Sequence, residues 1–132
     1  MNIKKKLIDK IKINGSINVS EFIQICQFEK DGYYLKNNPI GRSNDFITSP
    51  EISQMFGEIF GVFLINYWEE NIKTNFNLVE LGPGKGTLLK DILRTSYINQ
   101  KFLNSMNLTL IEKNKSLIDI QKKITTSKNI TW

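Results

Sequence analysis

Histidine and alanine are absent from the 132-residue sequence, and cysteine occurs once, at Cys26. Without histidine, neither a Cys2His2 zinc finger nor a Ser-His-Asp or Cys-His catalytic system can form. A single cysteine also excludes an internal disulfide. Any catalysis must therefore depend on carboxylate, amide or hydroxyl groups or on a bound cofactor, and no metal site is predicted.

Long hydrophobic runs are also missing. The longest one covers residues 59–65, far short of the ~20 apolar residues that a helix needs to cross a bilayer, and no membrane span is predicted. Residues 1–10 contain neither the apolar core of a signal peptide nor the arginine-rich, acid-free composition of a transit peptide. We therefore expect a cytoplasmic bacterial protein.

Arginine is scarce although the chain is basic. The net charge of +5 rests on 18 basic and 13 acidic residues, and only two of the basic residues are Arg. Isoleucine, lysine and asparagine together account for 51 of the 132 residues, a composition typical of genes rich in A and T. Because Arg is the usual reader of base edges and aromatic and basic residues do not cluster, no nucleic-acid partner is predicted. A lysine-rich nucleic-acid module would instead show an affinity that falls steeply with salt.

Apolar residues make up 40% of the chain, which is enough for a folded core, and their spacing predicts an α/β protein with two regions. Residues 1–75 have the pattern of helices and loops, with one helix near the start and a second one capped by Ser20. Residues 31–45 are rich in Gly and Asn and predict a long loop in which residues 33–35 are extended. Residues 76–132 alternate between strand and helix patterns.

A strong helix is predicted after residue 48. Thr48 and Glu51 fit a capping box, and Pro50 sits in the first turn, where its missing N–H costs nothing. Gly57 and Gly61 leave room for the close approach of another backbone. An apolar stripe follows at helical spacing and comprises Ile52, Met55, Phe56, Ile59, Phe63 and Tyr67.

Three polar residues share another face of this helix, namely Glu51, Gln54 and Glu58. They fit two interpretations. They form either a solvated polar face or the lining of a cleft, and the choice depends on the segment that follows in the chain.

A glycine-rich turn lies between a strand and a helix. Residues 76–81 form a short apolar strand, and residues 88–94 have helical spacing. Gly82, Gly84 and Gly86 stand at alternate positions between them. Glycine at the N-terminus of a helix lets an anionic group approach free backbone N–H groups closely, so this turn is predicted to bind a cofactor.

Three cofactor classes use such a turn. A dinucleotide fingerprint requires Gly where Thr87 stands. A P-loop requires Ser or Thr directly after its lysine, whereas Gly86 follows Lys85. The remaining pattern, the acidic Glu80 followed by alternate glycines, is seen in the doubly wound methyltransferases that use S-adenosylmethionine.

A second strand agrees with that interpretation. Residues 108–111 are apolar and are followed by Glu112, whose carboxylate can accept hydrogen bonds from both hydroxyls of a ribose. Residues 96–107 are polar and predict a loop, residues 117–124 predict a helix, and residues 129–132 begin a third strand. On pattern alone, a methyltransferase, another nucleotide-binding protein and a glycine turn beside a surface Glu112 all remain open.

Two sequence blocks in this order carry a family resemblance. Residues 44–58 (NDFITSPEISQMFGE) and residues 80–88 (ELGPGKGTL) closely resemble the S-adenosylmethionine-dependent methyltransferases that include the mitochondrial complex I assembly factor and its bacterial relatives. The resemblance covers nearly the whole chain. Family members commonly carry Gly where Asn44 stands and Arg where Lys85 stands. Neither departure abolishes the site, because Asn tolerates left-handed backbone and Lys keeps the charge.

The resemblance implies the N-terminal part of a doubly wound, Rossmann-like class I methyltransferase fold, preceded by a helical region. Family members continue well beyond residue 132, so we expect an incomplete sheet with an open edge and uncovered helices. This favours the product of a truncated or split gene. The alternative is a non-catalytic, decayed fragment or a half-protein that needs a separately encoded C-terminal part.

The resemblance also implies S-adenosylmethionine as the cofactor. Gly82, Gly84 and Gly86 would approach its methionine part. Glu80 would orient the loop or the cofactor's amino group, and Glu112 would hold the ribose.

The reaction implied by the resemblance is methylation of an arginine in a protein substrate, with a complex I subunit as the acceptor. An arginine side chain is a delocalised cation that carboxylates must align. The candidate catalytic carboxylates are Asp45, Glu51 and Glu58. Thr48 and Gln54 are candidate residues of the substrate cleft.

Overall fold

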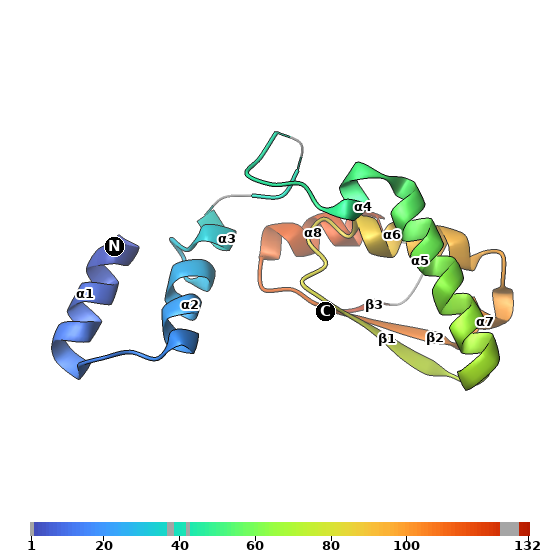
Figure 1. The fold of residues 1–132 in the computed structure, drawn as a ribbon, viewed down its shortest axis with the longest axis horizontal. Helices are drawn as coiled ribbons and strands as arrows, with labels where there is room; N and C mark the ends of the chain where they lie inside the picture. The colour runs from blue at the N-terminus through green and yellow to red at the C-terminus, as the bar shows by residue number, and fades with distance from the viewer. Residues whose placement is uncertain (1, 37–38, 42, 125–129) are drawn as a thin grey trace. The chain divides into compact units, whose positions relative to one another are not determined.

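The computed structural model describes residues 2–36, 39–41, 43–124 and 130–132 of the chain. The chain packs as two compact units, Met1–Pro39 and Ile40–Trp132. In the described part of the first unit, three helices follow one another (Figure 1), namely α1 (Ile3–Asn14), α2 (Val19–Phe28) and α3 (Tyr33–Lys36). Ion pairs between Lys10 and Glu21 and between Lys6 and Glu29 connect α1 with α2 and with the residue after it.

Two predictions for the first unit are wrong. The N-cap of α2 is Asn18, whose side chain accepts a hydrogen bond from the Glu21 backbone N–H at 2.8 Å, and the predicted cap Ser20 lies inside the helix. Residues 33–35 are helical rather than extended. Packing explains the second difference, because the Tyr34 ring stacks on Phe28 of α2 with 5.8 Å between the ring centroids.

The second unit combines a parallel sheet with helices (Figure 1). Its described elements are, in chain order, α4 (Ser49–Ile52), α5 (Gln54–Tyr67), the π-helical turn η1 (Trp68–Ile72), β1 (Phe76–Leu81), α6 (Thr87–Ser96), α7 (Gln100–Ser105), β2 (Met106–Ile111), α8 (Lys115–Ile124) and β3 (Ile130–Thr131). The predicted α/β class is confirmed. Since α4 and α5 pack against each other and against α6, the packing boundary after Pro39 lies well before the change of sequence pattern at residue 75.

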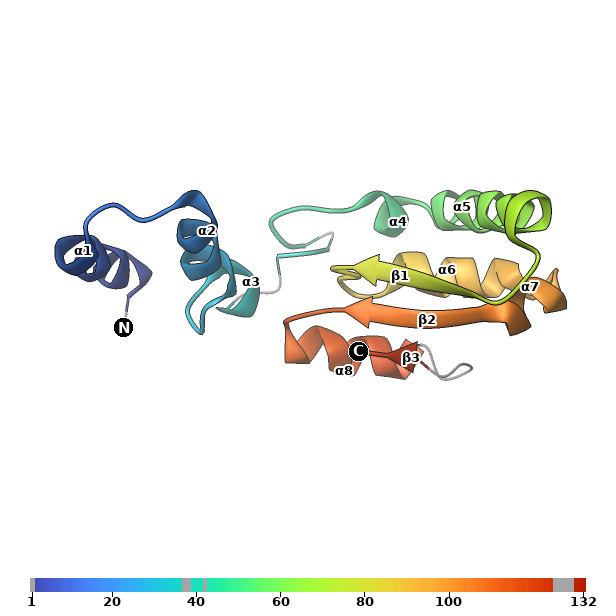
Figure 2. The same ribbon diagram turned by 90° about the horizontal axis from the view of Figure 1, so that it is seen from below.

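The described strands form one parallel sheet in the order β1-β2-β3. β1 pairs with β2 along its whole length, from Phe76 opposite Met106 to Leu81 opposite Ile111. β3 pairs with β2 at Leu108 and at Thr109. Helices α6 and α8 follow β1 and β2 and lie on the same face of the sheet, as the views in Figures 1 and 2 show together. Among the described elements of the second unit, both crossovers therefore leave the other face of the sheet open.

The two faces of the sheet differ in burial because successive side chains alternate between them. On β2, Met106, Leu108 and Leu110 face the helices and are buried. On the open face, which Figure 2 presents to the viewer, Leu81 of β1 and Ile111 of β2 are exposed. The predicted open, incomplete sheet is thus what the chain forms.

The core of the second unit lies between β2 and the helices. Leu89 and Leu93 of α6 pack there with the inward side chains of β2 and with Trp68, the first residue of η1. Phe102 of α7 is completely buried, and its ring centroid lies 5.2 Å from that of Phe76. The prediction of a loop over residues 96–107 is therefore wrong, because Phe102 and Leu103 pack against the core and hold a short helix within this polar stretch.

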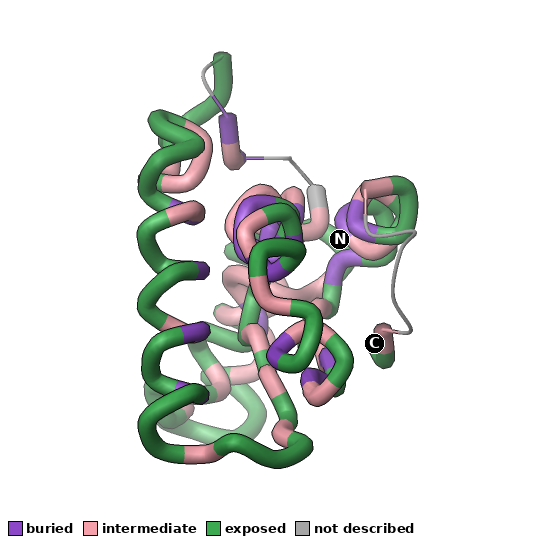
Figure 3. Tube along the Cα trace, turned by 90° about the vertical axis from the view of Figure 1, so that its right-hand side faces the viewer, coloured by how far each residue is buried: buried purple, intermediate pink, exposed green. Residues whose placement is uncertain are grey.

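The helix predicted after residue 48 is divided in two. Ser53 has extended backbone angles and separates α4 from α5. Thr48 precedes α4, but its side chain makes no capping hydrogen bond, so the predicted capping box is wrong. The buried residues of α5 recur on the side that faces the rest of the unit, as Figure 3 shows, and two of them are Gly57 and Gly61.

Candidate functional site

The glycine turn between β1 and α6 has backbone angles that favour glycine. Gly82, Gly84 and Gly86 have φ values of 63°, 58° and 78°, a region in which other residues are strained. The Gly82 N–H continues the β ladder by donating to the Ile111 carbonyl at 2.9 Å. Gly86 is the N-cap of α6 and has no side chain with which to cap it. The N-terminus of α6 is therefore open to a ligand from the loop side.

A hollow of about 150 Å³ lies against this turn. We call it the glycine hollow. It is lined by two motifs from distant parts of the sequence, the glycine turn and the start of α4, together with Glu80 at the end of β1 and Ile40. Thr48 and Glu51 represent the α4 motif. The structure thus brings together the two blocks that carry the family resemblance.

An ion pair joins the two walls of the glycine hollow. The Lys85 Nζ atom of the turn lies 3.4 Å from the nearer carboxylate oxygen of Glu51. The Glu51 side chain is only 12% exposed. A Cβ atom at Gly41 would lie 2.5 Å from Lys85 Nζ, so a side chain at position 41 would require the Lys85 ammonium group to move. In the sequence, Lys85 counted against a P-loop and as a departure from the family pattern, and its ion pair with Glu51 was not predicted.

Glu80 is the one residue of the glycine hollow with a resolved change in acidity among the groups that the structure describes. Burial raises the pKa of its carboxyl above the ordinary value of 4.5, because removal from water disfavours the charged form. Since Glu80 lines the hollow, a cationic group placed there would be attracted to the carboxylate and would lower its pKa again.

A second depression, of about 530 Å³, extends the glycine hollow along the outside of α6. We call it the polar groove. Pro50, Glu51, Lys85 and Thr87 line both depressions, so the groove and the hollow adjoin each other. Gln54, Lys90, Asp91 and Arg94 line only the groove. Of the predicted polar face, Glu51 and Gln54 therefore line depressions beside the turn.

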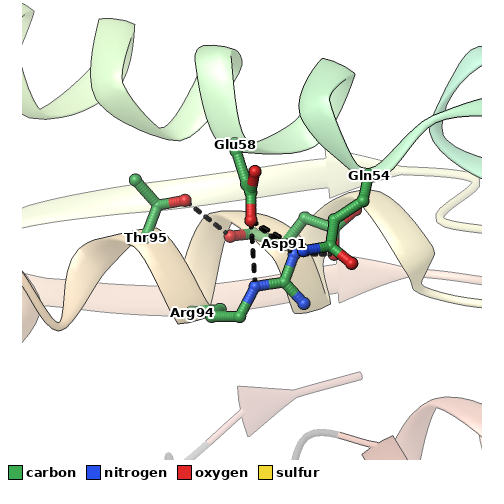
Figure 4. A network of polar contacts seen from close by, with 5 residues as sticks. All are labelled: Gln54, Glu58, Asp91, Arg94 and Thr95. Carbon is green, nitrogen blue, oxygen red and sulfur yellow. Dashed lines mark hydrogen bonds and ion pairs between the residues drawn. The ribbon is translucent and has the colours of Figure 1, made fainter.

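Glu58 is held by a different set of contacts, drawn in Figure 4. Its Oε1 atom accepts hydrogen bonds from Gln54 Nε2 at 2.8 Å and from Arg94 Nε at 3.3 Å. Arg94 also donates to Asp91 Oδ1 at 2.7 Å, and the Asp91 side chain is only 5% exposed. Glu58 lines neither the glycine hollow nor the polar groove, and its contacts link α5 to α6.

The other two predicted carboxylates lie outside the glycine hollow. Glu112 follows β2, at the same edge of the sheet as the turn, and its Oε1 accepts hydrogen bonds from the backbone N–H groups of Lys113 and Asn114, both at 2.8 Å. Asp45 is exposed and does not line the hollow. The binding role predicted for Glu112 and the catalytic role predicted for Asp45 stay predictions.

One residue that touches the turn escaped the sequence prediction. Gln121 of α8 is completely buried, and its Nε2 atom donates to the Gly84 carbonyl oxygen at 2.7 Å. A signal existed, because Gln121 stands four residues after the buried Leu117 and therefore on the inward side of α8. A polar residue at such a position requires a buried partner.

The described residues hold neither a cluster of potential metal ligands nor a helix that could span a membrane. Residues 2–36, 39–41, 43–124 and 130–132 contain no group of three or more His, Cys, Asp or Glu side chains that could hold a metal ion. No helix in these ranges is long and apolar enough to cross a membrane.

Comparison with known proteins gives matches over most of the chain. Residues 59–132 match the family described as putative S-adenosyl-L-methionine-dependent methyltransferase. The bovine (Bos taurus) protein arginine methyltransferase NDUFAF7, mitochondrial, is 44% identical over 130 residues, which cover 96% of this chain and 30% of the relative. The human (Homo sapiens) protein of the same name is 40% identical over 130 residues, with the same two coverages.

A solved structure is similar in fold. The crystal structure of a COG1565 superfamily member from Burkholderia thailandensis, bound to S-adenosyl-homocysteine, superimposes with a TM-score of 0.74 at 18% identity. The match covers 98% of this chain and 36% of that one. The chain thus spans about a third of the length of the proteins it matches. The prediction of a cytoplasmic bacterial protein is wrong, because the relatives that match nearly the whole chain are designated mitochondrial.

Proposed function

The chain belongs to the putative S-adenosyl-L-methionine-dependent methyltransferases. On that premise we propose that it takes part in the methylation of arginine side chains in a protein. It supplies the glycine turn that binds the cofactor and the carboxylate that binds the arginine. The family and the cofactor predicted from the sequence are confirmed. The observation that carries the proposal is the glycine hollow, in which the turn meets Glu51 across an ion pair.

The residues around the turn fit the cofactor. Gly82, Gly84 and Gly86 keep the backbone free of side chains, and the uncapped start of α6 attracts a carboxylate. The Glu80 carboxylate suits the ammonium group at the same end of the cofactor. When bound, S-adenosylmethionine supplies a methyl group on a positively charged sulfur atom. For the ribose hydroxyls we retain Glu112, which lies at the same edge of the sheet.

Glu51 is the residue proposed to bind the arginine that accepts the methyl group, because it alone of Asp45, Glu51 and Glu58 lines the glycine hollow. Its carboxylate is held by Lys85 at 3.4 Å and 3.5 Å, one distance to each oxygen. These contacts are longer than the ~2.8 Å of a strong charge-assisted hydrogen bond. A guanidinium group offers a planar fork of donors to a carboxylate. Glu51 therefore orients the acceptor so that one nitrogen faces the methyl group.

The acceptor that we propose is an arginine of a complex I subunit, as the family resemblance implies. Thr48 lines the glycine hollow and Gln54 lines the polar groove. Both are therefore proposed to contact the polypeptide that carries this arginine. The hollow, of about 150 Å³, is too small for a whole substrate segment, whereas the groove of about 530 Å³ adjoins it.

A second proposal concerns completion of the fold. We infer that a further polypeptide, encoded with this chain or separately, covers the open face of the sheet and the outer face of α5. Exposed apolar residues on both surfaces favour this inference, with Leu81 73% and Ile59 62% exposed. A chain that remained uncovered would behave as the non-catalytic fragment that is the alternative function.

The test uses labelled S-adenosylmethionine and an arginine-containing peptide. The chain is assayed alone and mixed with the C-terminal part of the bovine relative. We expect Glu51→Gln to lower methyl transfer by about 100-fold or more while the affinity for S-adenosylhomocysteine, measured by calorimetry, stays within about twofold of the parent value. Glu58→Gln is the matched control and should retain transfer, because Glu58 contacts Arg94 instead of the hollow. Equal losses in both variants would contradict the role of Glu51.

Glu80 gives a pH test of the cofactor site. Because the pKa of this carboxyl is raised in the folded chain, its contribution to stability is present below about pH 4.5 and is lost as the pH rises through the raised pKa. Glu80→Gln should therefore stabilise the chain at neutral pH and have little effect below pH ~4. If the cofactor's ammonium pairs with Glu80, binding of S-adenosylhomocysteine near the raised pKa releases protons. Calorimetry in two buffers of different ionisation enthalpy measures that release, which Glu80→Gln should abolish.

A further inference from the structure

Two hydrogen bonds in series connect the end of the chain with the glycine turn. The Trp132 Nε1–H donates to Gln121 Oε1 at 2.9 Å, and Gln121 Nε2 donates to the Gly84 carbonyl at 2.7 Å. Gln121 belongs to α8 and Trp132 directly follows β3. The amide of Gln121 is thus oriented from both ends, because only one assignment of its oxygen and nitrogen satisfies both neighbours.

Packing places α8 directly behind the turn. A Cβ atom at Gly86 would lie 2.9 Å from Ile124 Cδ1 and 3.4 Å from Gln121 Cγ. Gln121 is completely buried, so loss of either hydrogen bond would leave a polar group without water to replace its partner. The Trp132 ring is itself held by the Lys122 ammonium, which lies 5.4 Å from the ring centroid.

The hydrogen bond from Gln121 to the Gly84 carbonyl determines the direction of the next backbone N–H in the turn. In a trans peptide unit, the C=O and the following N–H point to opposite sides, and the chain has no cis peptide bond in its described residues. Holding the Gly84 carbonyl on the α8 side therefore directs the Lys85 N–H away from α8. Gly84 and Lys85 both line the glycine hollow.

We infer that Gln121 is a positioning residue for the cofactor turn and that Trp132 fixes the orientation of its amide. The inference rests on the proposed function, because it assigns Gln121 to the turn that binds the cofactor. Gln121 does not line the hollow, so its proposed effect on the cofactor passes through the hydrogen bond to the Gly84 carbonyl. Trp132 directly follows β3, so the position of β3 influences the affinity for the cofactor. This holds although β2 lies between β3 and β1, the strand that leads into the turn.

The experiment measures two quantities in the full chain, the affinity for S-adenosylhomocysteine and the hydrogen exchange of the Gly84 to Gly86 amides without ligand. Gln121→Leu removes both hydrogen bonds and should weaken binding about tenfold. Gln121→Glu keeps the oxygen that Trp132 binds but replaces the donor to Gly84, and it should weaken binding at least as much. Trp132→Phe removes only the outer bond and should have a smaller effect, about threefold. In all three variants the turn amides should exchange faster.

Two controls separate positioning from general destabilisation. Leu117→Val reduces packing of the same buried side of α8 without touching either hydrogen bond, and it should lower the melting temperature while leaving affinity and turn exchange unchanged. Asp119→Asn alters an exposed residue of α8 and should change neither quantity. Leu117→Val and Gln121→Leu are compared at an equal loss of melting temperature. The inference is overturned if Leu117→Val then accelerates hydrogen exchange of the turn amides as much as Gln121→Leu does.

The two readouts also separate this inference from the proposed function. If the parent chain does not bind S-adenosylhomocysteine but the turn amides respond selectively to Gln121→Leu, the positioning role holds and the cofactor assignment of this chain fails. If the parent binds and Gln121→Leu binds equally well with unchanged exchange, the cofactor assignment holds and Gln121 does not position the turn.

Discussion

Helices α5 and α6 lie side by side in the second unit and differ in how many of their large apolar side chains they bury. On α6, large apolar side chains such as Leu89 and Leu93 point into the core, and polar ones such as Lys90 are exposed. On α5, Ile65 is buried with Gly57 and Gly61, whereas most of the large apolar side chains face outward. The comparison teaches that a strongly apolar helix face is not always the face that packs.

Distances at the contact explain the difference. A Cβ atom at Gly57 would lie 2.5 Å from Asp91 Cβ, and one at Gly61 would lie 2.9 Å from Thr95 Cβ. The two helices are so close that only α6 contributes side chains at these two contacts, while α5 contributes glycines. The apolar stripe of α5 must therefore lie elsewhere, and Phe56, Ile59, Phe60 and Phe63 surround an apolar hollow of about 410 Å³ on the outer surface.

The largest predicted effect compares an inward residue of α6 with an outward residue of α5. Leu89→Ala should lower the free energy of unfolding by about 2–5 kcal/mol, because it leaves a cavity in the core. Ile59→Ala should lower it by no more than about 0.5–1 kcal/mol, because Ile59 is 62% exposed. Urea denaturation followed by tryptophan fluorescence gives both values. Similar losses for the two variants would mean that the outer face of α5 is covered in solution.

The second prediction concerns the glycine contact itself. In an exposed helix, Gly→Ala is stabilising by up to about 1 kcal/mol. Gly61→Ala should instead destabilise the chain by about 1–3 kcal/mol, because the new methyl group overlaps Thr95. Asn66→Ala, on an exposed part of the same helix, is the control and should be neutral or slightly stabilising. A stabilised Gly61→Ala variant would show that α5 can move away from α6 without cost.

Local patterns in the sequence predicted much of the sheet and of the turn. The strand over residues 76–81 has the predicted bounds, because an apolar run followed by Gly82 contains its own stop signal. The turn itself is recognisable for the same reason, since glycines at alternate positions suit only a few backbone paths. The helix over residues 117–124 likewise appears within α8, because its apolar residues recur at helical spacing.

Long-range contacts explain what the sequence did not predict. Glu51 and Glu58 lie on one face of the predicted helix, and only the distant Arg94 and Lys85 give them different partners. The direction in which the α5 stripe faces depends on the Gly61 contact with α6, which no local pattern contains. Phe102 gave too weak a periodic signal to predict α7, although its burial determines that helix.

The third prediction tests the polar link between the two helices. Arg94→Met removes the partner of the Asp91 carboxylate, whose other oxygen already lacks a hydrogen-bond partner among the described residues. We expect a loss of about 1–3 kcal/mol in the free energy of unfolding. Glu58→Gln should lower the free energy of unfolding by less than about 1 kcal/mol, because the side chains of Glu58 and Arg94 are each 40% exposed. Recovery of most of the loss in an Arg94→Met, Asp91→Asn double variant would assign it to the unpaired carboxylate.

The smallest effect on stability is expected on the outer face of α5, where Phe63 is 56% exposed. Phe63→Ser should change the free energy of unfolding by about 0.5–1 kcal/mol, through the loss of the ring contacts with Phe60 and Tyr67, because serine and phenylalanine have similar helix propensities. Binding of a hydrophobic dye should fall clearly in the same variant, because the apolar hollow loses one of its walls. Leu89→Ala should show the reverse combination, with a large loss of stability and no decrease in dye binding. If Phe63→Ser instead destabilised the chain as much as Leu89→Ala, the stripe of α5 would be a second core, and the contrast between the two helices would disappear.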